Sequence, residues 1–296
     1  MKIVVNDLTE FCLLDGGKFA VDSTAQADFF CKKIAKKHYE NFPVSSFLIP
    51  YKLQKHFFSI YAFARIADDI GDELSLLANN EQSLIALENY EHCLENIYIN
   101  ESLISNPIFL ALKSTVEQFN IPILPFKKLL VAFKSDINFK QPENFEELFE
   151  YCVHSANPVG ELLLRIFDEY NEMNLQYSNC ICTALQFINF WQDFSVDLNR
   201  GRCYIPKSIL GEAYNYPSVH NFISAKSEKE LFDIFYKLYE VTEKEIEQGK
   251  KLLKNIKNTR FRLELFAIIF CGELVSKKIK KQKLNIFFTR PKLFFT

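Results

Sequence analysis

Two stretches of this chain place aspartates one helical turn apart within largely apolar sequence. Asp193 and Asp197 lie in the stretch 189–206, and Asp68 and Asp72 lie in a similar stretch upstream. Residues four apart leave one face of an α-helix together, so each stretch predicts a helix with an acidic face. Because burying two like charges without a partner is costly, we expect these carboxylates to serve divalent metal and phosphate.

Helical signals extend over most of the chain. Its 296 residues contain only 8 Gly and 10 Pro, too few for the many tight turns of an all-β fold. Apolar residues recur at helical spacing, and prolines and capping residues divide this pattern into segments. The predicted helices span about 24–40, 51–76, 81–98, 103–119, 126–137, 174–198, 228–255 and 260–281.

The domain organisation follows from this pattern. A hydrophobic content of 48% is ample for a buried core, and no repeat, linker or shift in composition marks a second domain. We predict one all-α catalytic domain at 23–282 around a central apolar cavity. An N-terminal extension at 1–22 precedes it, and a basic, aromatic tail at 283–296 follows it.

The composition narrows the class of protein. Lys plus Arg (35) nearly match Asp plus Glu (37), and the net charge of −2 argues against nucleic acid as a partner. The eight cysteines lack metal-finger spacing and indicate free, buried thiols in a reducing cytoplasm. No signal peptide or window of ~20 apolar residues is present, so we expect at most peripheral membrane contact. The 30 phenylalanines either fill a core or line a cavity for an apolar substrate.

A further helical segment starts near Asn144 and contains Pro158. A proline inside a helix removes an N–H donor and clashes with the preceding turn, so we expect a break near Asn157. The polar residues His154 and Ser155 lie in the same segment. The sequence therefore predicts polar side chains where the helix path changes.

The acidic pairs suit one kind of ligand. Mg²⁺ prefers oxygen ligands in octahedral geometry and typically takes one or two carboxylates with phosphate oxygens and water. Two such helix faces across a cavity would hold Mg²⁺ and a diphosphate, and Arg65, one turn before Asp68 and Asp69, would add a cation to the same anion. For each pair alone, the alternative is an ordinary solvated acidic face.

The motifs around these aspartates resemble a known family. They are Tyr61-Ala-Phe-Ala-Arg65 before Asp68-Asp69-Ile-Gly-Asp72, Gln186-Phe-Ile-Asn189-Phe-Trp-Gln-Asp193-Phe-Ser-Val-Asp197, and Gly201-Arg-Cys-Tyr-Ile-Pro206. In this order they are similar to the squalene and phytoene synthases, and the resemblance runs from about residue 32 to 280. It implies an all-α isoprenoid-synthase fold whose two aspartate-rich helices bind Mg²⁺ and a prenyl diphosphate.

The resemblance also implies roles for individual residues. Asp68, Asp72, Asp193 and Asp197 become Mg²⁺ ligands, with Asp69 in support. The residues implied to contact the substrate or its diphosphate are Tyr61, Arg65, Gln186, Asn189, Gln192, Arg202 and Tyr204.

Three departures from the family pattern narrow the resemblance. Gln192 stands where condensing members usually have an arginine before the second aspartate motif. The phosphate-contacting segment at 38–44 has lost positive charge, and residues 154–160 replace an apolar kink. These segments resemble the bacterial hydroxysqualene synthases of hopanoid pathways, which ionise presqualene diphosphate and let water capture the rearranged cation. An enzyme that handles one diphosphate needs fewer cationic contacts, which is consistent with Gln192.

Water capture requires a polar group that holds a water molecule near the cation. His154, Ser155 and Asn157 are candidates at the predicted helix break, and Tyr151, one turn upstream, matches a family tyrosine near the reacting carbons. Alternatively, His154 is a core histidine with satisfied hydrogen bonds, Ser155 and Asn157 cap the broken backbone, and Tyr151 is structural.

Basic residues near the end of the chain suggest contacts with anions. Arg260 and Arg262 open the last predicted helix and either close on the diphosphate, as a basic residue does in relatives, or are solvated. Residues 277–296 mix cations with Phe and either touch an anionic membrane or pack back on the domain. We expect a cytoplasmic protein, peripheral at most on the inner face of the membrane, with other squalene-pathway enzymes as neighbours.

Two other functions stay open. The first is head-to-head condensation of two prenyl diphosphates to presqualene diphosphate, squalene, dehydrosqualene or phytoene. The second is a non-catalytic assembly or binding factor of the same fold, against which the four aspartates argue. No NADPH is expected for hydroxysqualene formation, and a missing glycine-rich fingerprint decides nothing because the family lacks one.

Overall fold

The structure is a computed structural model that describes residues 5–37, 49–77, 79–99, 103–211 and 218–282. Helices and connecting turns account for these residues, and no strand occurs among them, which confirms the all-α prediction. The chain divides into two compact units. Unit 1 is Met1–Asn138 with Leu162–Glu169, and unit 2 is Phe139–Glu161 with Tyr170–Thr296. The domain boundaries expected at residues 23 and 282 stay predictions.

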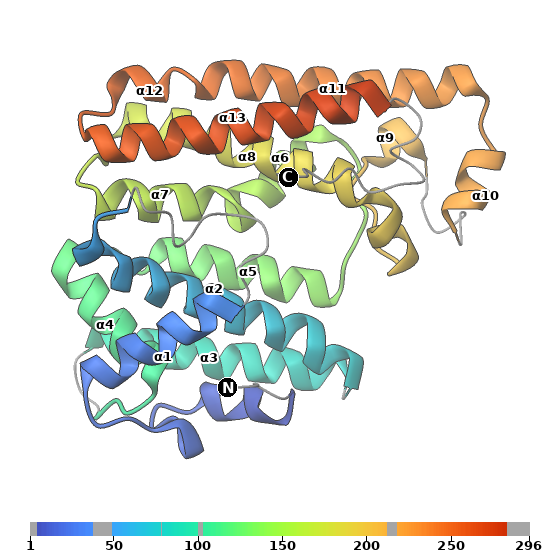
Figure 1. Ribbon diagram of the computed structural model, residues 1–296. Helices are drawn as coiled ribbons and strands as arrows, with labels where there is room; N and C mark the ends of the chain where they lie inside the picture. Colours follow the sequence, from blue (N-terminus) through green and yellow to red (C-terminus); the bar gives the residue numbers. More distant parts are fainter. Residues whose placement is uncertain (1–4, 38–48, 78, 100–102, 212–217, 283–296) are drawn as a thin grey trace. The chain divides into compact units, whose positions relative to one another are not determined.

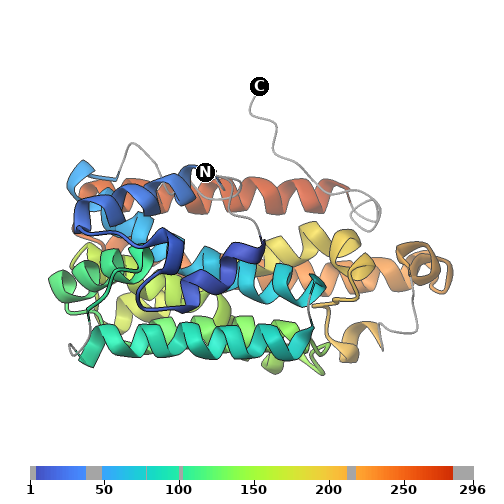
Figure 2. The ribbon, with the colours of Figure 1, turned by 90° about the horizontal axis from the view of Figure 1, so that it is seen from below.

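Unit 1 is a bundle of α-helices preceded by short 3-10 helices (Figure 1). The central helix is α2, because it contacts α1, α3, α4 and α5 as well as the first 3-10 helix. Figure 2 shows α1 lying beside α4, and the two helices are in contact. The elements are η1 (Val5–Cys12), η2 (Gly17–Phe19), α1 (Thr24–Lys37), α2 (Tyr51–Leu77), α3 (Asn80–Ile99), α4 (Pro107–Phe119) and α5 (Leu124–Ile137).

Aromatic rings fill the core of unit 1. Phe63 on α2 stacks on Tyr90 of α3 at 5.2 Å, and it meets Phe126 of α5 edge-on at 5.3 Å. Tyr90 also packs against Phe109 of α4 at 4.8 Å and donates a hydrogen bond to the Phe63 carbonyl. These phenylalanines therefore fill a core, which is the first of the two interpretations of the high Phe content.

The N-terminal extension is part of this core at the residues that the structure describes. Leu8 and Phe11 of η1 are almost completely buried. The Asn106 side chain ties this stretch to α4, because its amide donates to the carbonyls of Phe11 and Leu13 at 3.0 and 2.9 Å. The same side chain accepts from Ile108 N and so caps the start of α4.

Unit 2 is organised around one long helix, α8 (Figure 1). This helix contacts α6, α10, α11, α12 and α13. The elements are α6 (Phe145–Ser155), the first half of α7 (Asn157–Ile166), α8 (Glu172–Asn199), α9 (Lys207–Leu210), α10 (Val219–Ser224), α11 (Glu228–Gly249), α12 (Leu252–Asn255) and α13 (Thr259–Gln282).

The structure contains four short elements that the sequence did not predict, namely η1, η2, α9 and α10. Among the predicted helices, two bounds differ by several residues for a reason that the structure shows. The helix expected from residue 103 starts at Pro107, because the Asn106 side chain caps it there. The helix expected over 228–255 ends at Gly249, and α12 follows after one turn. In that turn Lys251 N donates to Gln248 O three residues back, which ends the regular α-helical pattern.

The structure also bears on the expectations about the cysteines and about membrane-spanning helices. All eight cysteines are free, and Cys12, Cys31, Cys93, Cys152 and Cys203 are buried, as their scattered spacing predicted. None of the helices in the described ranges combines the length and apolarity that crossing a membrane would require. The segment at 38–44 and the tail at 283–296 lie outside the described residues.

Candidate functional site

The first acidic cluster lies on α2, within unit 1. Ile66, Ala67 and Ile70 are fully buried on one side of this helix. Asp68 and Asp72, four residues apart, are only partly buried. The helical spacing of apolar and acidic residues therefore produces a buried side and a carboxylate-bearing side, as predicted.

Arg65 connects this cluster through two ion pairs. Its guanidinium lies 3.3 Å from Asp68 Oδ2 and 2.5 Å from Asp69 Oδ1. Asp69 is only 5% exposed, so its charge depends on this partner. Tyr61, one turn before Arg65, contributes to the electrostatic environment of the guanidinium. The structure thus brings together the predicted group Tyr61, Arg65, Asp68 and Asp69.

The carboxylates of this cluster crowd one another. Desolvation and then Asp72 raise the pKa of Asp68 to about 7, while Arg65 opposes the shift. Desolvation also raises the pKa of Asp69, again against the effect of Arg65. Burial lowers the pKa of Arg65, but the two aspartates more than offset this, and the net shift is upward. One guanidinium does not neutralise the cluster, so a further cation would stabilise it.

A residue that the sequence analysis missed also acts on this cluster. Asp136, near the end of α5, raises the pKa of Asp68 through its charge. The sequence around a single aspartate near a helix end does not distinguish a functional residue from an ordinary solvent-exposed one. Only the contact of α5 with α2 brings this carboxylate into the cluster.

The second acidic cluster lies on α8, within unit 2. Gln186, Asn189, Asp193 and Asp197 follow one another at intervals of three, four and four residues. Such intervals place them in one stripe along the helix, and all four are half-buried. Gln192 lies beside this stripe and is half-buried as well. The predicted diphosphate-binding and metal-binding residues of α8 therefore share one face.

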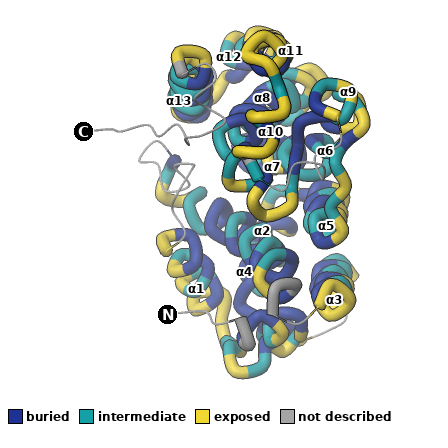
Figure 3. Tube along the Cα trace, turned by 90° about the vertical axis from the view of Figure 1, so that its right-hand side faces the viewer, coloured by how far each residue is buried: buried dark blue, intermediate teal, exposed yellow. Residues whose placement is uncertain are grey.

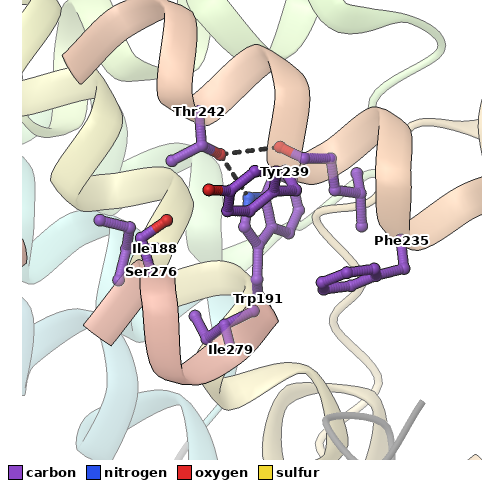
Figure 4. Close-up of a pocket in the computed structure, with 8 residues that line it drawn as sticks. Ile188, Trp191, Phe235, Tyr239, Thr242, Ser276 and Ile279 are labelled. Carbon is purple, nitrogen blue, oxygen red and sulfur yellow. Dashed lines mark hydrogen bonds between the residues drawn. The ribbon is translucent and has the colours of Figure 1, made fainter. Parts of the chain in front are cut away.

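The aromatic part of the same motif points into the core of unit 2. Trp191 lines a small cavity of about 10 Å³ formed by α8, α11 and α13 (Figure 4). Its indole N–H donates to the Thr242 hydroxyl at 2.8 Å, and that hydroxyl donates to the Leu238 carbonyl at 2.8 Å. This cavity holds about one water molecule at most. Trp191 therefore anchors α8, while its neighbours Gln192 and Asp193 carry the polar face.

The turn after α8 folds back on the last turn of that helix. Gly201 adopts a positive φ of 78°, which a residue with a Cβ rarely does. The Asp197 carbonyl then accepts hydrogen bonds from Arg200 N and Arg202 N, both at 2.9 Å. The sequence motif after Asp197 is thus a helix-ending turn that returns Arg202 to the last turn of α8.

Aromatic stacking accounts for two predicted site residues. Tyr204 stacks on Phe190 of α8 at 3.8 Å with an interplanar angle of 9°. The Tyr151 ring of α6 lies 5.6 Å from Tyr204 and 5.9 Å from Phe190. Both tyrosines therefore have a packing role in unit 2, and a contact of either with substrate stays a prediction.

The predicted helix break is present. Helix α6 ends at Ser155 and α7 begins at Asn157, so Ala156 separates them. Just beyond it, Gly160 packs closely on α8, because a Cβ there would lie 2.3 Å from Ser178 Oγ. The break and the close approach together hold the start of α7 against α8.

The polar groups at the break differ in their partners. His154 Nδ1 donates to the Glu150 carbonyl of its own helix at 3.1 Å. Asn157 is buried, and its side-chain oxygen accepts from the Thr183 hydroxyl at 3.1 Å. The Ser155 hydroxyl is buried and has no hydrogen-bond partner among the described residues. Ser155 is therefore the group at the break with unused hydrogen-bonding capacity.

The basic residues at the start of α13 are both exposed. Arg260 and Arg262 lie in its first turn, and Arg262 N donates to the Asn258 carbonyl. This exposure agrees with the interpretation as solvated helix-end residues, and a role in diphosphate binding stays a prediction.

The carboxylates of the two acidic clusters are chemically suited to bind Mg²⁺. Carboxylate oxygens on α2 and α8 are the ligands that this ion prefers, and Asp68 is crowded by like charges. Within the described ranges, no group of three or more His, Cys, Asp or Glu side chains lies close enough to hold a metal ion by itself. The metal-ligand roles of Asp68, Asp69, Asp72, Asp193 and Asp197 stay predictions.

These observations define an all-α protein with two aspartate-bearing helices, one with an arginine beside its aspartates and the other with amide side chains. Residues 35–294 match the sequence family described as squalene/phytoene synthase. The chain belongs to the squalene/phytoene synthase family.

Individual relatives agree with this membership. A hydroxysqualene synthase from Sinorhizobium fredii is 29% identical over 239 residues, which are 80% of this chain and 78% of the relative. A hydroxysqualene synthase from Zymomonas mobilis is 35% identical over 174 residues, which are 58% of this chain and 56% of the relative. The crystal structure of squalene synthase HpnC from Alicyclobacillus acidocaldarius is similar with a TM-score of 0.78 and 31% identity, covering 89% of this chain and 97% of that one. The isoprenoid-synthase fold expected from the sequence is confirmed.

Proposed function

We propose that this chain is a Mg²⁺-dependent enzyme that processes a prenyl diphosphate, and specifically a hydroxysqualene synthase. Its reaction would convert presqualene diphosphate and water to hydroxysqualene and diphosphate. The observation that carries the proposal is the pair of carboxylate-bearing helix faces, both within the region that matches the family. Similarity to two hydroxysqualene synthases supports the specific reaction.

The carboxylates, Arg65 and the amide side chains would each stabilise the departing diphosphate in a different way. Asp68, Asp69, Asp72, Asp193 and Asp197 would hold the Mg²⁺, which when bound neutralises the diphosphate as the C–O bond ionises. Arg65 is pre-oriented by its ion pairs with Asp68 and Asp69, so it would contact the diphosphate without further ordering. Gln186 and Asn189 would donate side-chain N–H groups from the same face of α8.

Gln192 supports a substrate with a single diphosphate. It lies half-buried beside the stripe of α8, where an arginine would add a full positive charge. An enzyme that binds two diphosphates at once must neutralise more negative charge than one that binds a single diphosphate. A neutral amide at this position therefore favours presqualene diphosphate over two prenyl diphosphates.

Ser155 is the better candidate for holding the water that captures the cation. Its hydroxyl is buried and lacks a partner among the described residues, whereas Asn157 is bonded to Thr183 and His154 to Glu150. A buried hydroxyl without a protein partner is an expected site for an ordered water molecule. Among the sequence-based candidates His154, Ser155 and Asn157, these hydrogen bonds therefore favour Ser155 for the water-holding role, while Tyr151, His154 and Asn157 stay candidates for other catalytic contacts.

Head-to-head condensation is the second candidate, since a relative is described as a squalene synthase. Purified protein with Mg²⁺ is incubated separately with presqualene diphosphate and farnesyl diphosphate in water enriched in ¹⁸O. We expect turnover of presqualene diphosphate alone, with ¹⁸O in the alcohol. Turnover of farnesyl diphosphate alone would establish condensation, and turnover of neither would establish a binding factor.

A second experiment tests the water-holding group. We expect Ser155→Ala to shift the product from alcohol toward hydrocarbon, while His154→Leu leaves the product ratio unchanged. If Ser155→Ala lowers the rate without changing the product ratio, the hydroxyl does not position the water.

A further inference from the structure

A basic and aromatic surface lies on unit 1, far along the helix from the aspartates. It is formed by α1 and the first turn of α2, and its members are Phe29, Lys32, Lys33, Tyr51, Lys52 and Lys55. We call it the α1–α2 basic surface. Lys55 precedes Asp68 by 13 residues, which is about 20 Å along an α-helix. The proposed catalytic residues of α2 are therefore not part of it.

One face of α1 supplies half of this surface. Ala27, Cys31 and Ile34 are buried toward the core of unit 1. Phe29 and Lys33 lie on the opposite side and are exposed. Figure 3 shows buried and exposed positions alternating along α1 in this way. The helix is thus amphipathic, but its outer stripe combines an aromatic ring with ammonium groups.

Two aromatic side chains of this surface are strongly exposed beside its lysines. Phe29 is 58% exposed and Tyr51 is 82% exposed. Lys33 Nζ lies over the Phe29 ring at 4.5 Å from its centroid, so cation and ring act as one patch. A ring beside lysines is the composition that binds the boundary between lipid head groups and acyl chains.

The charge of the surface is strongly one-sided. Lys32, Lys33, Lys52 and Lys55 form no ion pair with any carboxylate of the described residues. Asp28 is the acidic residue that lines the same groove. The full chain has a net charge of −2, so this local excess of cations is not an average property of the protein.

The surface is also concave. Between α1 and the start of α2 lies an open groove of about 540 Å³, lined by Lys32, Tyr51, Lys52 and Lys55 among others. This volume is within the range of small-molecule pockets and would admit a phosphorylated head group. The lysines at its rim would then meet the phosphate as point charges.

We propose that the α1–α2 basic surface docks the protein onto membranes that contain anionic phospholipids. Charge complementarity selects an anionic surface, and the two exposed rings select a lipid boundary rather than a purely polar polyanion. The proposal does not depend on the reaction assigned above. If that reaction is correct, docking would bring the active site to the layer that holds its apolar substrate.

The test measures co-sedimentation of the full-length protein with vesicles of phosphatidylglycerol and phosphatidylcholine, compared with phosphatidylcholine alone. The variant carries Lys32→Glu, Lys33→Glu and Lys52→Glu. Each lysine near an anionic surface contributes about fivefold to binding, so we expect a loss of roughly 100-fold. A matched control carries Lys229→Glu, Lys237→Glu and Lys244→Glu, which change the net charge equally on exposed positions of α11.

The control should bind as the unchanged protein does, and circular dichroism should show equal helicity in all three. A second variant, Phe29→Ser with Tyr51→Ser, should weaken binding in high salt, where lysine contacts are screened. The proposal is overturned if the lysine variant binds vesicles as well as the unchanged protein, or if the control loses as much. Sedimentation with neutral vesicles alone, or retention only by duplex DNA, would overturn it as well.

Discussion

The acidic clusters of α2 and α8 use the same spacing of aspartates but different surroundings. On α2 the carboxylates are crowded by Asp136 and held by the charged partner Arg65. On α8 the two aspartates follow the neutral amides of Gln186 and Asn189 along the same stripe. Arg65 therefore offsets part of the negative charge within the α2 cluster, whereas the α8 face offers carboxylates next to amide side chains. The two faces should therefore respond differently when a single residue is changed.

The largest expected effect comes from removing one carboxylate from either face. Asp68→Asn and Asp193→Asn should each lower kcat/KM for presqualene diphosphate by about 1000-fold, because each removes a proposed ligand of the Mg²⁺ that would neutralise the leaving diphosphate. Steady-state kinetics at saturating Mg²⁺ measure this. Asp233→Asn, on an exposed position of α11, is the control and should leave the rate unchanged. If only one of the two variants loses activity, the faces do not act on the same diphosphate.

The next largest effect is a difference in folding stability between variants of the α2 face and variants of the α8 face. Arg65→Met leaves buried Asp69 without its ion-pair partner and should lower the free energy of unfolding by about 3 kcal/mol in urea. Gln192→Met on α8 should cost less than about 1 kcal/mol, since it removes no charge partner. Adding Asp69→Asn to Arg65→Met should restore most of the loss. Equal losses for the two single variants would contradict the difference between the faces.

One buried histidine of unit 1 should contribute to the pH dependence of stability. His56 of unit 1 is buried, lies 3.0 Å from Thr115 Oγ1, and has a pKa lowered from 6.5 to about 4 by burial and then by Lys55. Because the unfolded chain binds a proton at higher pH than the folded one, His56 stabilises the fold above pH 6.5. That stability is lost as the pH falls, by about 2 kcal/mol between pH 7 and pH 5.

Hydrogen exchange over the amides of unit 1 measures this contribution as a difference between two proteins. Asp68 of the same unit has a raised pKa, which acts on stability in the opposite direction over this pH range, so the unchanged protein alone does not report His56. In His56→Leu, protection of unit 1 amides should fall less on acidification than in the unchanged protein. An unchanged profile in that variant would assign the acid sensitivity to other groups.

The smallest effect concerns the anchor of α8. Trp191→Phe removes the hydrogen bond to Thr242 but keeps an aromatic ring in the core, so it should cost about 1 kcal/mol of stability. Activity should change little, because Trp191 faces the core and not the polar stripe. A double-mutant cycle with Thr242→Val isolates the hydrogen bond. A large loss of activity without loss of stability would show that Trp191 contacts substrate.

The fold was largely predictable because its signals are local. The apolar spacing that predicted a helix at about 51–76 corresponds to α2 at Tyr51–Leu77, and the expected break near Asn157 falls at Ala156. Errors arose where one side-chain cap or one backbone turn sets the end of a helix. The Asn106 cap sets the start of α4, and the turn after Gly249 separates α12 from α11.

The candidate site was predictable only in part. The placement of Asp68 with Asp72, and of Asp193 with Asp197, follows from helical geometry alone. Asp136 joins the α2 cluster because α5 packs on α2, and no residue spacing in the sequence predicts this. Likewise, Ser155, His154 and Asn157 are equivalent polar residues in the sequence, and only their hydrogen bonds distinguish them.

The sequence by itself determined the helices, the acidic faces and the membership in a family, because each depends on residues close together in the chain or on ordered motifs. Tertiary structure alone decided which partners these faces have: Arg65 bound to buried Asp69, Trp191 bonded to Thr242, and Tyr204 stacked on Phe190. The physical reason is that side-chain partners, burial and the resulting pKa shifts depend on packing between distant segments. A spacing of four residues specifies a face, and the packing around that face specifies its chemistry.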